Sequence, residues 1–209
     1  MKILYNDLDI AVIVKPYGVN SQNSEGENIP DLLAQKLNIQ PFVVHRLDRT
    51  TGGVMVYALN PRSAAHLSKQ ITENRFKKEY LAVVQGEIEE NTGTMTDLLY
   101  YDKQKNKAYV VKKERKGVKK AILHYEVLKV FEQNDTTYSL LKIALETGRT
   151  HQIRVQFASR GFPLCGDRRY GSKENLKNIS LWAHTLSFNH PKTNKPLTYT
   201  AEPNEDFLI

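Results

Sequence analysis

The sequence predicts a single α/β domain of the α+β type over residues 1–209, with a mixed, largely antiparallel sheet and helices on its flanks. Two observations predict this fold. Short runs rich in β-branched and aromatic residues recur along the chain between Asn, Asp and Gly turns. Between some of these runs lie segments with helical periodicity that begin at Asn or Pro, residues that start helices. A hydrophobic content of 40% in 209 residues is sufficient for one full core.

The predicted strands are short and bounded by turn residues. Ten runs have strand composition: residues 3–5, 10–14, 42–44, 54–59, 76–84, 108–111, 121–131, 138–145, 180–189 and 197–201. Runs 121–131 and 138–145 alternate apolar and polar residues, as hairpin strands with one solvated face do. Lys15 directly follows the second run. Its side chain could point into a cleft, but solvent is the expected position because lysines are rarely buried.

Three segments predict helices. Pro30 fits the first turn of a short one, and Asn60 can cap a second whose first position is Pro61. The third follows Thr147 or Thr150, either of which can supply an N-cap.

The segment from His45 to Gly53 is the first candidate for chemistry. It places Asp48 between Arg46 and Arg49, in a polar loop between two predicted strands. Two neighbouring cations favour the ionised carboxylate, which could act as a nucleophile or as a base. The alternative is a structural Asp that forms an Asx-turn or an ion pair. The residue order of this segment also resembles a kinase catalytic loop. No Gly-rich phosphate loop precedes it, so a kinase is disfavoured.

A second dense motif covers residues 146–157. It gathers Arg149, His151 and Gln152 before the third predicted helix, where several donors suit an anion such as a phosphate or a carboxylate. Arg154 lies among apolar residues, where an unpaired cation is costly. We therefore expect a carboxylate partner for it, such as Asp48.

The charge balance favours a polyanionic partner. The chain has 30 Lys and Arg against 23 Asp and Glu, a net charge of +7. Basic side chains are densest over residues 102–120. This hairpin is either a solvated, protected sheet edge or a phosphate-contacting surface, and the sequence favours neither.

Several function classes are disfavoured. Cys165 is the only cysteine, so a disulfide framework and a Cys-based zinc site are excluded, and a reducing compartment is expected. The 6 His residues show no metal-ligand spacing, so no metal is expected. The acids near Met1 argue against a signal peptide, and no apolar run approaches the roughly 18 residues of a membrane span. We expect a cytoplasmic protein that makes no membrane contact.

Read together, five ordered motifs resemble the RluA-type pseudouridine synthase family. They span nearly the whole chain: residues 13–18, 45–53, 78–84, 147–155 and 166–171. The resemblance implies the pseudouridine synthase fold with a central RNA-binding cleft. It also implies the isomerisation of uridine to pseudouridine in structured rRNA or tRNA, by base flipping and without a cofactor.

The resemblance also implies residue roles. Asp48 matches the essential aspartate, Tyr80 the tyrosine that packs on the target base, and Arg154 the basic residue that pairs with the aspartate. Arg46 matches an arginine that occupies the space left by a flipped base. The predicted RNA-binding residues are Lys15, Arg46, Arg49, Arg149, His151 and Gln152.

One departure from the family pattern concerns RNA affinity. Many members carry an N-terminal RNA-binding domain of the S4 type, whereas here the catalytic pattern begins almost at Met1. We therefore expect a chain without an S4 domain, acting as a monomer. Two alternatives are a non-catalytic RNA-binding or RNA-chaperone protein, and an N-glycosylase that uses Asp48. The second is disfavoured because the motifs contain no second acid.

Overall fold

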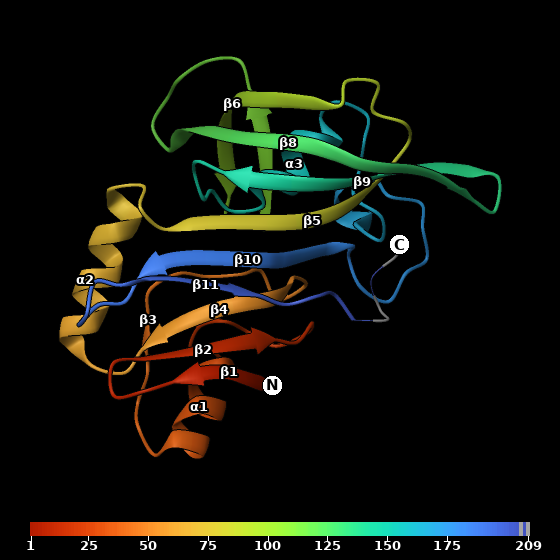
Figure 1. Ribbon diagram of the computed structural model, residues 1–209. Coiled ribbons are helices and arrows are strands. Elements are labelled where there is room, and N and C mark those ends of the chain that lie inside the picture. Colours follow the sequence, from red (N-terminus) through yellow and green to blue (C-terminus); the bar gives the residue numbers. More distant parts are fainter. Residues whose placement is uncertain (205–206, 208–209) are drawn as a thin grey trace. The chain divides into compact units, whose positions relative to one another are not determined.

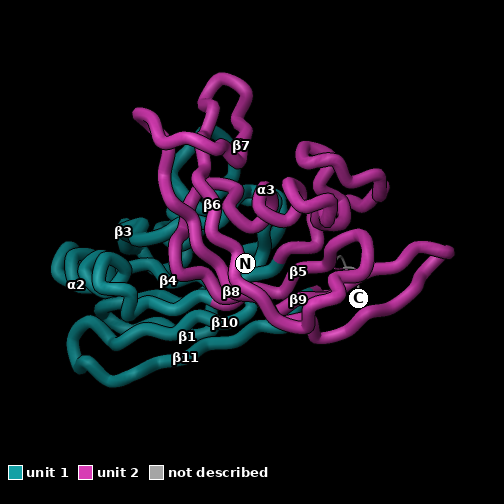
Figure 2. The backbone as a smooth tube through the Cα atoms, turned by 90° about the horizontal axis from the view of Figure 1, so that it is seen from above, with its two compact units in different colours: residues 1–78, 182–203 teal, residues 79–181, 204–209 magenta. Residues whose placement is uncertain are grey.

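The computed structural model describes residues 1–204 and 207. The chain divides into two compact units, drawn in teal and magenta in Figure 2. Unit 1 comprises Met1–Lys78 and Trp182–Pro203, and unit 2 comprises Glu79–Leu181 with residues 204 and 207. The predicted α+β fold with a mixed, largely antiparallel sheet is confirmed. The prediction of one domain over residues 1–209 stays a prediction.

Unit 1 contains a mixed sheet (Figure 1). Its strands are β1 (Lys2–Asn6), β2 (Ile10–Lys15), β3 (Phe42–Val43), β4 (Gly52–Ala58), β10 (Leu181–Asn189) and β11 (Pro196–Thr200). Strand β2 lies antiparallel between β1 and β4, while β3 and β11 pair antiparallel with β4 and β10. The β4–β10 pair is parallel. Apolar side chains from β2, β4 and β10 form a core with Leu67 and Phe76.

The two helices of unit 1 begin where the sequence predicts. Helix α1 (Ile29–Leu37) follows Asn28, whose side-chain oxygen accepts a hydrogen bond from the backbone N–H of Asp31. Helix α2 (Pro61–Thr72) follows Asn60, which accepts from the N–H of Ser63. These bonds satisfy backbone donors that a helix leaves unpaired in its first turn. The predicted Asn60 cap is therefore confirmed.

Gly53 permits a close approach between β4 and β10. Its φ of +120° is one that side-chain-bearing residues rarely adopt, and a Cβ built on it would lie 2.6 Å from the backbone nitrogen of Ala183. Real Cβ atoms essentially never come so close to another atom, so this strand pair requires glycine. The preceding Gly52 meets the ring of Trp182 in a similar way.

We expect Gly53→Ala to lower the free energy of unfolding by about 3 kcal/mol, through overpacking and backbone strain together. Gly171→Ala is a matched control, because Gly171 has a φ of +101° but no atom within 4 Å of a built Cβ. The control should lose only about 1 kcal/mol. Urea unfolding of both variants measures the difference, and equal losses would contradict the close approach as the cause.

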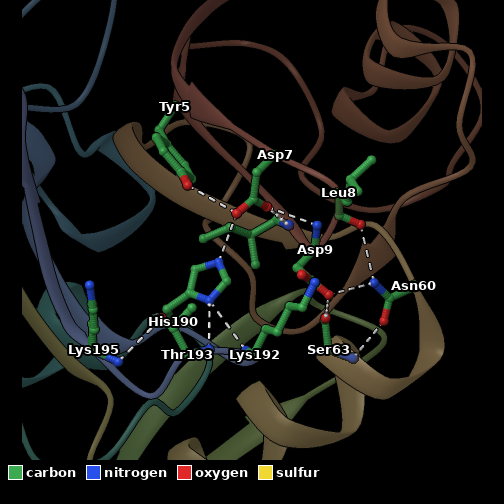
Figure 3. A network of polar contacts seen from close by, with 11 residues as sticks. Tyr5, Asp7, Leu8, Asp9, Asn60, Ser63, His190, Lys192, Thr193 and Lys195 are labelled. Carbon is green, nitrogen blue, oxygen red and sulfur yellow. Dashed lines mark hydrogen bonds and ion pairs between the residues drawn. The ribbon is translucent and has the colours of Figure 1, made fainter.

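A polar network ties two turns of unit 1 together (Figure 3). Asp7, in the β1–β2 turn, accepts hydrogen bonds from the N–H groups of Asp9 and Ile10, from the Tyr5 hydroxyl and from His190 Nε2 at 2.8 Å. Burial raises the pKa of Asp7, but these bonds outweigh it and lower the pKa below its usual value. Asp7, Asp9 and His190 could hold a metal ion, yet the ligand atoms of Asp7 and His190 already take part in these bonds. We interpret the network as a structural link between the β1–β2 turn and the β10–β11 turn, which contains His190.

Unit 2 contains an antiparallel sheet in the order β5-β9-β8-β6-β7. Its strands are β5 (Lys77–Gln85), β6 (Thr92–Asp102), β7 (Lys107–Val111), β8 (Val118–Gln133) and β9 (Thr136–Leu145). The predicted hairpin of runs 121–131 and 138–145 is therefore confirmed. Helix α3 (Gln152–Ala158) and the short 3₁₀ helix η1 (Arg168–Tyr170) complete the unit. Val155 and Tyr170 pack with Leu99, Ala108 and Ala121 in a second core.

The predicted threonine cap of the third helix is wrong. His151 precedes α3 in a left-handed conformation, with φ of 55°, and makes no capping bond with its side chain. Thr147 instead accepts from the N–H of Ile122 in β8 and donates to Gln152. The hydroxyl thus binds a neighbouring strand, which periodicity and local capping patterns do not reveal.

None of the helices in the described part of the chain has the length and apolar character needed to cross a lipid bilayer.

Candidate active site

Asp48 lies in the loop between β3 and β4 of unit 1, as the sequence predicts. Its side chain is partly exposed, and its backbone carbonyl accepts a hydrogen bond from the N–H of Thr51 at 2.9 Å. This bond closes a tight turn around Asp48. The hydrogen bond therefore fixes the backbone conformation from which the Asp48 carboxylate projects.

The residue after Asp48 is held by the segment that follows β2. The carbonyl of Arg49 accepts from the N–H of Gly18 at 2.8 Å and from Lys15 Nζ at 3.3 Å. In return, Arg49 Nε donates to the carbonyl of Gly18 at 2.7 Å. The loop is therefore bound through both the main chain and the side chain of Arg49. The rest of the Arg49 side chain is exposed, as contact with RNA would require.

The expectation that Lys15 points to solvent is wrong, because its side chain is fully buried. Its Nζ donates to the carbonyls of Pro16 and Val19 at 2.8 and 2.7 Å, in addition to Arg49. Three acceptors suit an ammonium group, which has three N–H donors. Burial lowers the pKa of Lys15 to about 7, a shift that Asp48 opposes and Arg49 supports. This geometry makes Lys15 a brace of the loop, and its contact with RNA stays a prediction.

The residues before Asp48 are divided between interior and surface. His45 Nε2 accepts from the N–H of Val56 at 3.2 Å, and its ring meets Phe76 edge-on. Burial lowers the pKa of His45 to about 3, so its imidazole is neutral and takes the tautomer with the proton on Nδ1. Arg46 is exposed and free to approach a ligand.

Arg154, on α3 of unit 2, forms a buried ion pair with Asp167. Arg154 Nε and Nη2 donate to the two Asp167 carboxylate oxygens at 2.6 and 2.9 Å. The side chains are 5% and 1% exposed, and the ring of Tyr170 lies 5.1 Å from the guanidinium carbon. A bidentate pair fixes the plane of the guanidinium as well as its charge. Asp167 is not among the predicted site residues, although it is the only acid in the basic motif 166–171.

The remaining predicted residues of unit 2 differ in exposure. Gln152 is 3% exposed, and its amide bonds to Thr147, to the carbonyl of Ile122 and to the N–H of Arg149. His151 is 9% exposed and lies 2.9 Å from the Tyr170 hydroxyl. Arg149 is exposed, with Nε bonded to the carbonyl of Lys120. Of these residues, Arg149 has the exposure that RNA contact requires.

Tyr80 lies on β5 opposite Ile143 of β9 and is 6% exposed. The predicted residues are thus divided between the units. Asp48 is in unit 1, with Lys15, Arg46 and Arg49, whereas Tyr80 and Arg154 are in unit 2 with the other three. The Asp48–Arg154 pairing stays a prediction.

The chain is similar in sequence to RNA pseudouridine synthases. Residues 9–159 match the family model described as RNA pseudouridylate synthase. An "Uncharacterized RNA pseudouridine synthase" of Aquifex aeolicus is 36% identical, with 99% of this chain and 71% of the relative covered. "Ribosomal large subunit pseudouridine synthase D" of Borreliella burgdorferi is 34% identical over 88% of this chain and 59% of the relative.

A solved structure supports the fold. "Human RNA Pseudouridylate Synthase Domain Containing 1" superposes with a TM-score of 0.79 at 24% identity, covering 97% of this chain and 83% of that one.

The fold and the matching sequences define the class as RNA-modifying isomerases. The chain belongs to the RNA pseudouridylate synthase family. The predictions of an RluA-type member and of an enzyme of this class are therefore confirmed.

Proposed function

We propose that this chain converts uridine to pseudouridine in the RNA of the large ribosomal subunit, with Asp48 as the catalytic carboxylate. The observation that carries the proposal is that the loop around Asp48 is held in place. The backbone carbonyl of Arg49 accepts hydrogen bonds from the N–H of Gly18 and from Lys15 Nζ. A fixed, partly exposed carboxylate suits chemistry better than a flexible surface acid does. The relatives from Borreliella burgdorferi and Buchnera aphidicola that are named as ribosomal large subunit synthases support this choice of RNA.

The reaction needs no co-reactant, because it is an isomerisation. The C1′–N1 bond of uridine breaks, the uracil rotates, a C1′–C5 bond forms, and the proton at C5 leaves while N1 gains one. Cleavage develops positive charge on the sugar, which the Asp48 carboxylate can stabilise or trap covalently at C1′. The same carboxylate could instead remove a proton from C2′. Both routes require an ionised Asp48 close to the sugar.

Tyr80 and Arg154 complete the proposed site. Tyr80 would stack on the uracil, and its hydroxyl would take part in removing the C5 proton. Arg154 would pair with Asp48, and the bidentate pair with Asp167 gives the Arg154 guanidinium a fixed direction. Exposed Arg46 would fill the space in the RNA stack that the flipped base leaves.

The basic segment, residues 102–120, is the proposed surface for the RNA backbone. It is not one hairpin as predicted, because β7 and β8 pair with opposite edges of β6. The turn between β6 and β7 is held by Arg169 Nη1, which donates to the carbonyls of Lys105 and Asn106. The guanidinium of Arg115 lies over the ring of Tyr100 at 4.7 Å. The exposed cations of the basic segment are Lys103, Lys105, Lys112, Lys113, Arg115, Lys116, Lys119 and Lys120. A dense cluster of exposed Lys and Arg side chains, on a backbone fixed by hydrogen bonds, suits contacts with RNA phosphates.

We expect the triple variant Lys112→Gln, Lys113→Gln, Lys116→Gln to raise KM for RNA about tenfold or more, with kcat unchanged. The slope of log K against log salt should fall by roughly 2, because each phosphate contact contributes about 0.7 to 0.9. The control makes the same charge change at exposed Lys36, Lys69 and Lys192 of unit 1. Equal slopes for both triple variants would show that the basic segment contributes only net charge.

Tritium release from RNA labelled at C5 of uridine tests the proposed function, because the C5 proton is lost to water. Transcripts of large-subunit rRNA and of tRNA are compared with wild-type protein. We expect release from rRNA and little from tRNA. Release from tRNA alone would contradict the assigned RNA, and no release from either would contradict the proposed reaction.

A further inference from the structure

Ser21 forms a two-way bridge to the residue before Asp48. Its side chain is buried, and Oγ both donates to the carbonyl of Leu47 at 2.7 Å and accepts from the N–H of Leu47 at 3.2 Å. One hydroxyl thus satisfies both backbone groups of a residue that is 26 positions away in the chain. A buried backbone group without such a partner destabilises the fold, because it loses its hydrogen bonds to water and gains none in return. The bridge therefore fixes Leu47 strongly.

Tyr57 holds Ser21 in turn. Tyr57 lies on β4, is fully buried, and donates its hydroxyl proton to the carbonyl of Ser21 at 2.8 Å. Burial raises the pKa of Tyr57, so the phenol keeps the proton that it donates. Strand β4 pairs along its length with β2, which gives the tyrosine a rigid base. A chain of bonds runs from this strand through Tyr57 and Ser21 to Leu47.

The two residues that flank Asp48, Leu47 and Arg49, are held by different sets of hydrogen bonds. Ser21 holds Leu47 through both its N–H and its carbonyl, while Lys15 and Gly18 hold the carbonyl of Arg49. Loss of either anchor would let the turn shift relative to β4. The sequence motif around Asp48 contains neither Ser21 nor Tyr57.

We propose that Ser21, held by Tyr57, is a positioning residue that fixes Asp48 for reaction. This inference rests on the proposed function, because it assigns a residue to the same site. Ser21 acts through the backbone of Leu47 and touches no substrate. Catalysis is sensitive to such shifts, since a displacement of about 1 Å can cost about a hundredfold in rate.

The fold supplies a matched control in Ser139. Ser139 of β9 is fully buried, and its Oγ donates to the carbonyl of Gly86 at 2.9 Å and accepts from the N–H of Ile88 at 3.0 Å. It makes the same pair of bonds as Ser21 but braces the connection between β5 and β6 in unit 2. Replacing either serine by alanine removes one buried hydroxyl and two similar bonds.

The experiment compares steady-state tritium release by wild type, Ser21→Ala, Tyr57→Phe and Ser139→Ala. We expect Ser21→Ala to lower kcat by about ten- to a hundredfold with little change in KM. Tyr57→Phe should give a smaller loss of the same kind, and Ser139→Ala should stay within about twofold of wild type at similar loss of stability. Ser21→Thr, which keeps the hydroxyl, should restore most of the kcat lost in Ser21→Ala.

Hydrogen exchange at the Leu47 amide gives a second readout on the same folded proteins. Ser21→Ala should exchange this amide faster, whereas Ser139→Ala should leave it unchanged. If wild type turns over and Ser21→Ala keeps the kcat of Ser139→Ala, the inference is overturned. If wild type is inactive on every RNA, the proposed function fails and the positioning role falls with it. In that case faster Leu47 exchange would identify the bridge as purely structural.

Discussion

We expect Asp48→Asn to lower kcat for pseudouridine formation by at least about a thousandfold, a magnitude typical for loss of an essential catalytic group. An amide can neither trap a cation at C1′ nor take a proton from C2′, so both routes open to Asp48 are lost. Bonds from the backbone of residues 47–51 and from the side chains of Lys15, Ser21 and Arg49 hold the loop and do not depend on the Asp48 carboxylate. The fold and most of the RNA affinity should therefore survive in the variant.

The matched control for this variant is Asp135→Asn. Asp135 is exposed in the turn between β8 and β9 and has a φ of +57°, a conformation that asparagine also tolerates. The substitution makes the same charge change without touching the loop. Kinetics with labelled RNA and thermal unfolding compare both variants with wild type. Turnover by Asp48→Asn within about tenfold of wild type would remove Asp48 from its assigned role.

We expect the second large effect from Asp167→Asn, a loss of about 3 kcal/mol in the free energy of unfolding. Removing one partner of a buried ion pair typically costs about 3 to 5 kcal/mol. Arg154 and Asp167 are 5% and 1% exposed, so solvent cannot replace the lost carboxylate. Because the bidentate pair also orients Arg154, kcat should fall even at temperatures where the variant stays folded.

An exposed ion pair of the same unit provides the comparison. Lys142 and Glu79 lie 3.7 Å apart with side chains 43% and 35% exposed. Glu79→Gln should cost less than about 1 kcal/mol, as surface pairs do. Chemical denaturation measures both losses. A cost for Asp167→Asn no larger than that for Glu79→Gln would show that the buried pair does not stabilise unit 2.

Elements with strong local signals could be predicted from the sequence. Asn60 and Pro61 mark the start of α2, and strand alternation marks the β8–β9 hairpin, because each depends on residues close together in the chain. The position of Asp48 in a loop between two strands follows for the same reason.

The braces of the site could not be predicted, because their partners are distant in sequence. Lys15 is buried only because the carbonyls of Val19 and Arg49 surround its ammonium, and Arg49 lies 34 residues away. Ser21 reaches Leu47 across 26 residues, and Asp167 reaches Arg154 from beyond the end of α3. Periodicity and composition carry no information about such contacts, so residue type alone gave the commoner expectation for Lys15.

The most direct test of the proposed function is nucleoside analysis of large-subunit rRNA before and after incubation with wild-type protein, with the supernatant assayed for free uracil. We expect pseudouridine at a defined position, an equal loss of uridine and no free uracil, because the base is rejoined through C5. Free uracil without pseudouridine would identify an N-glycosylase instead. Tight RNA binding with unchanged nucleosides in every RNA tested would contradict catalysis and favour an RNA-binding protein.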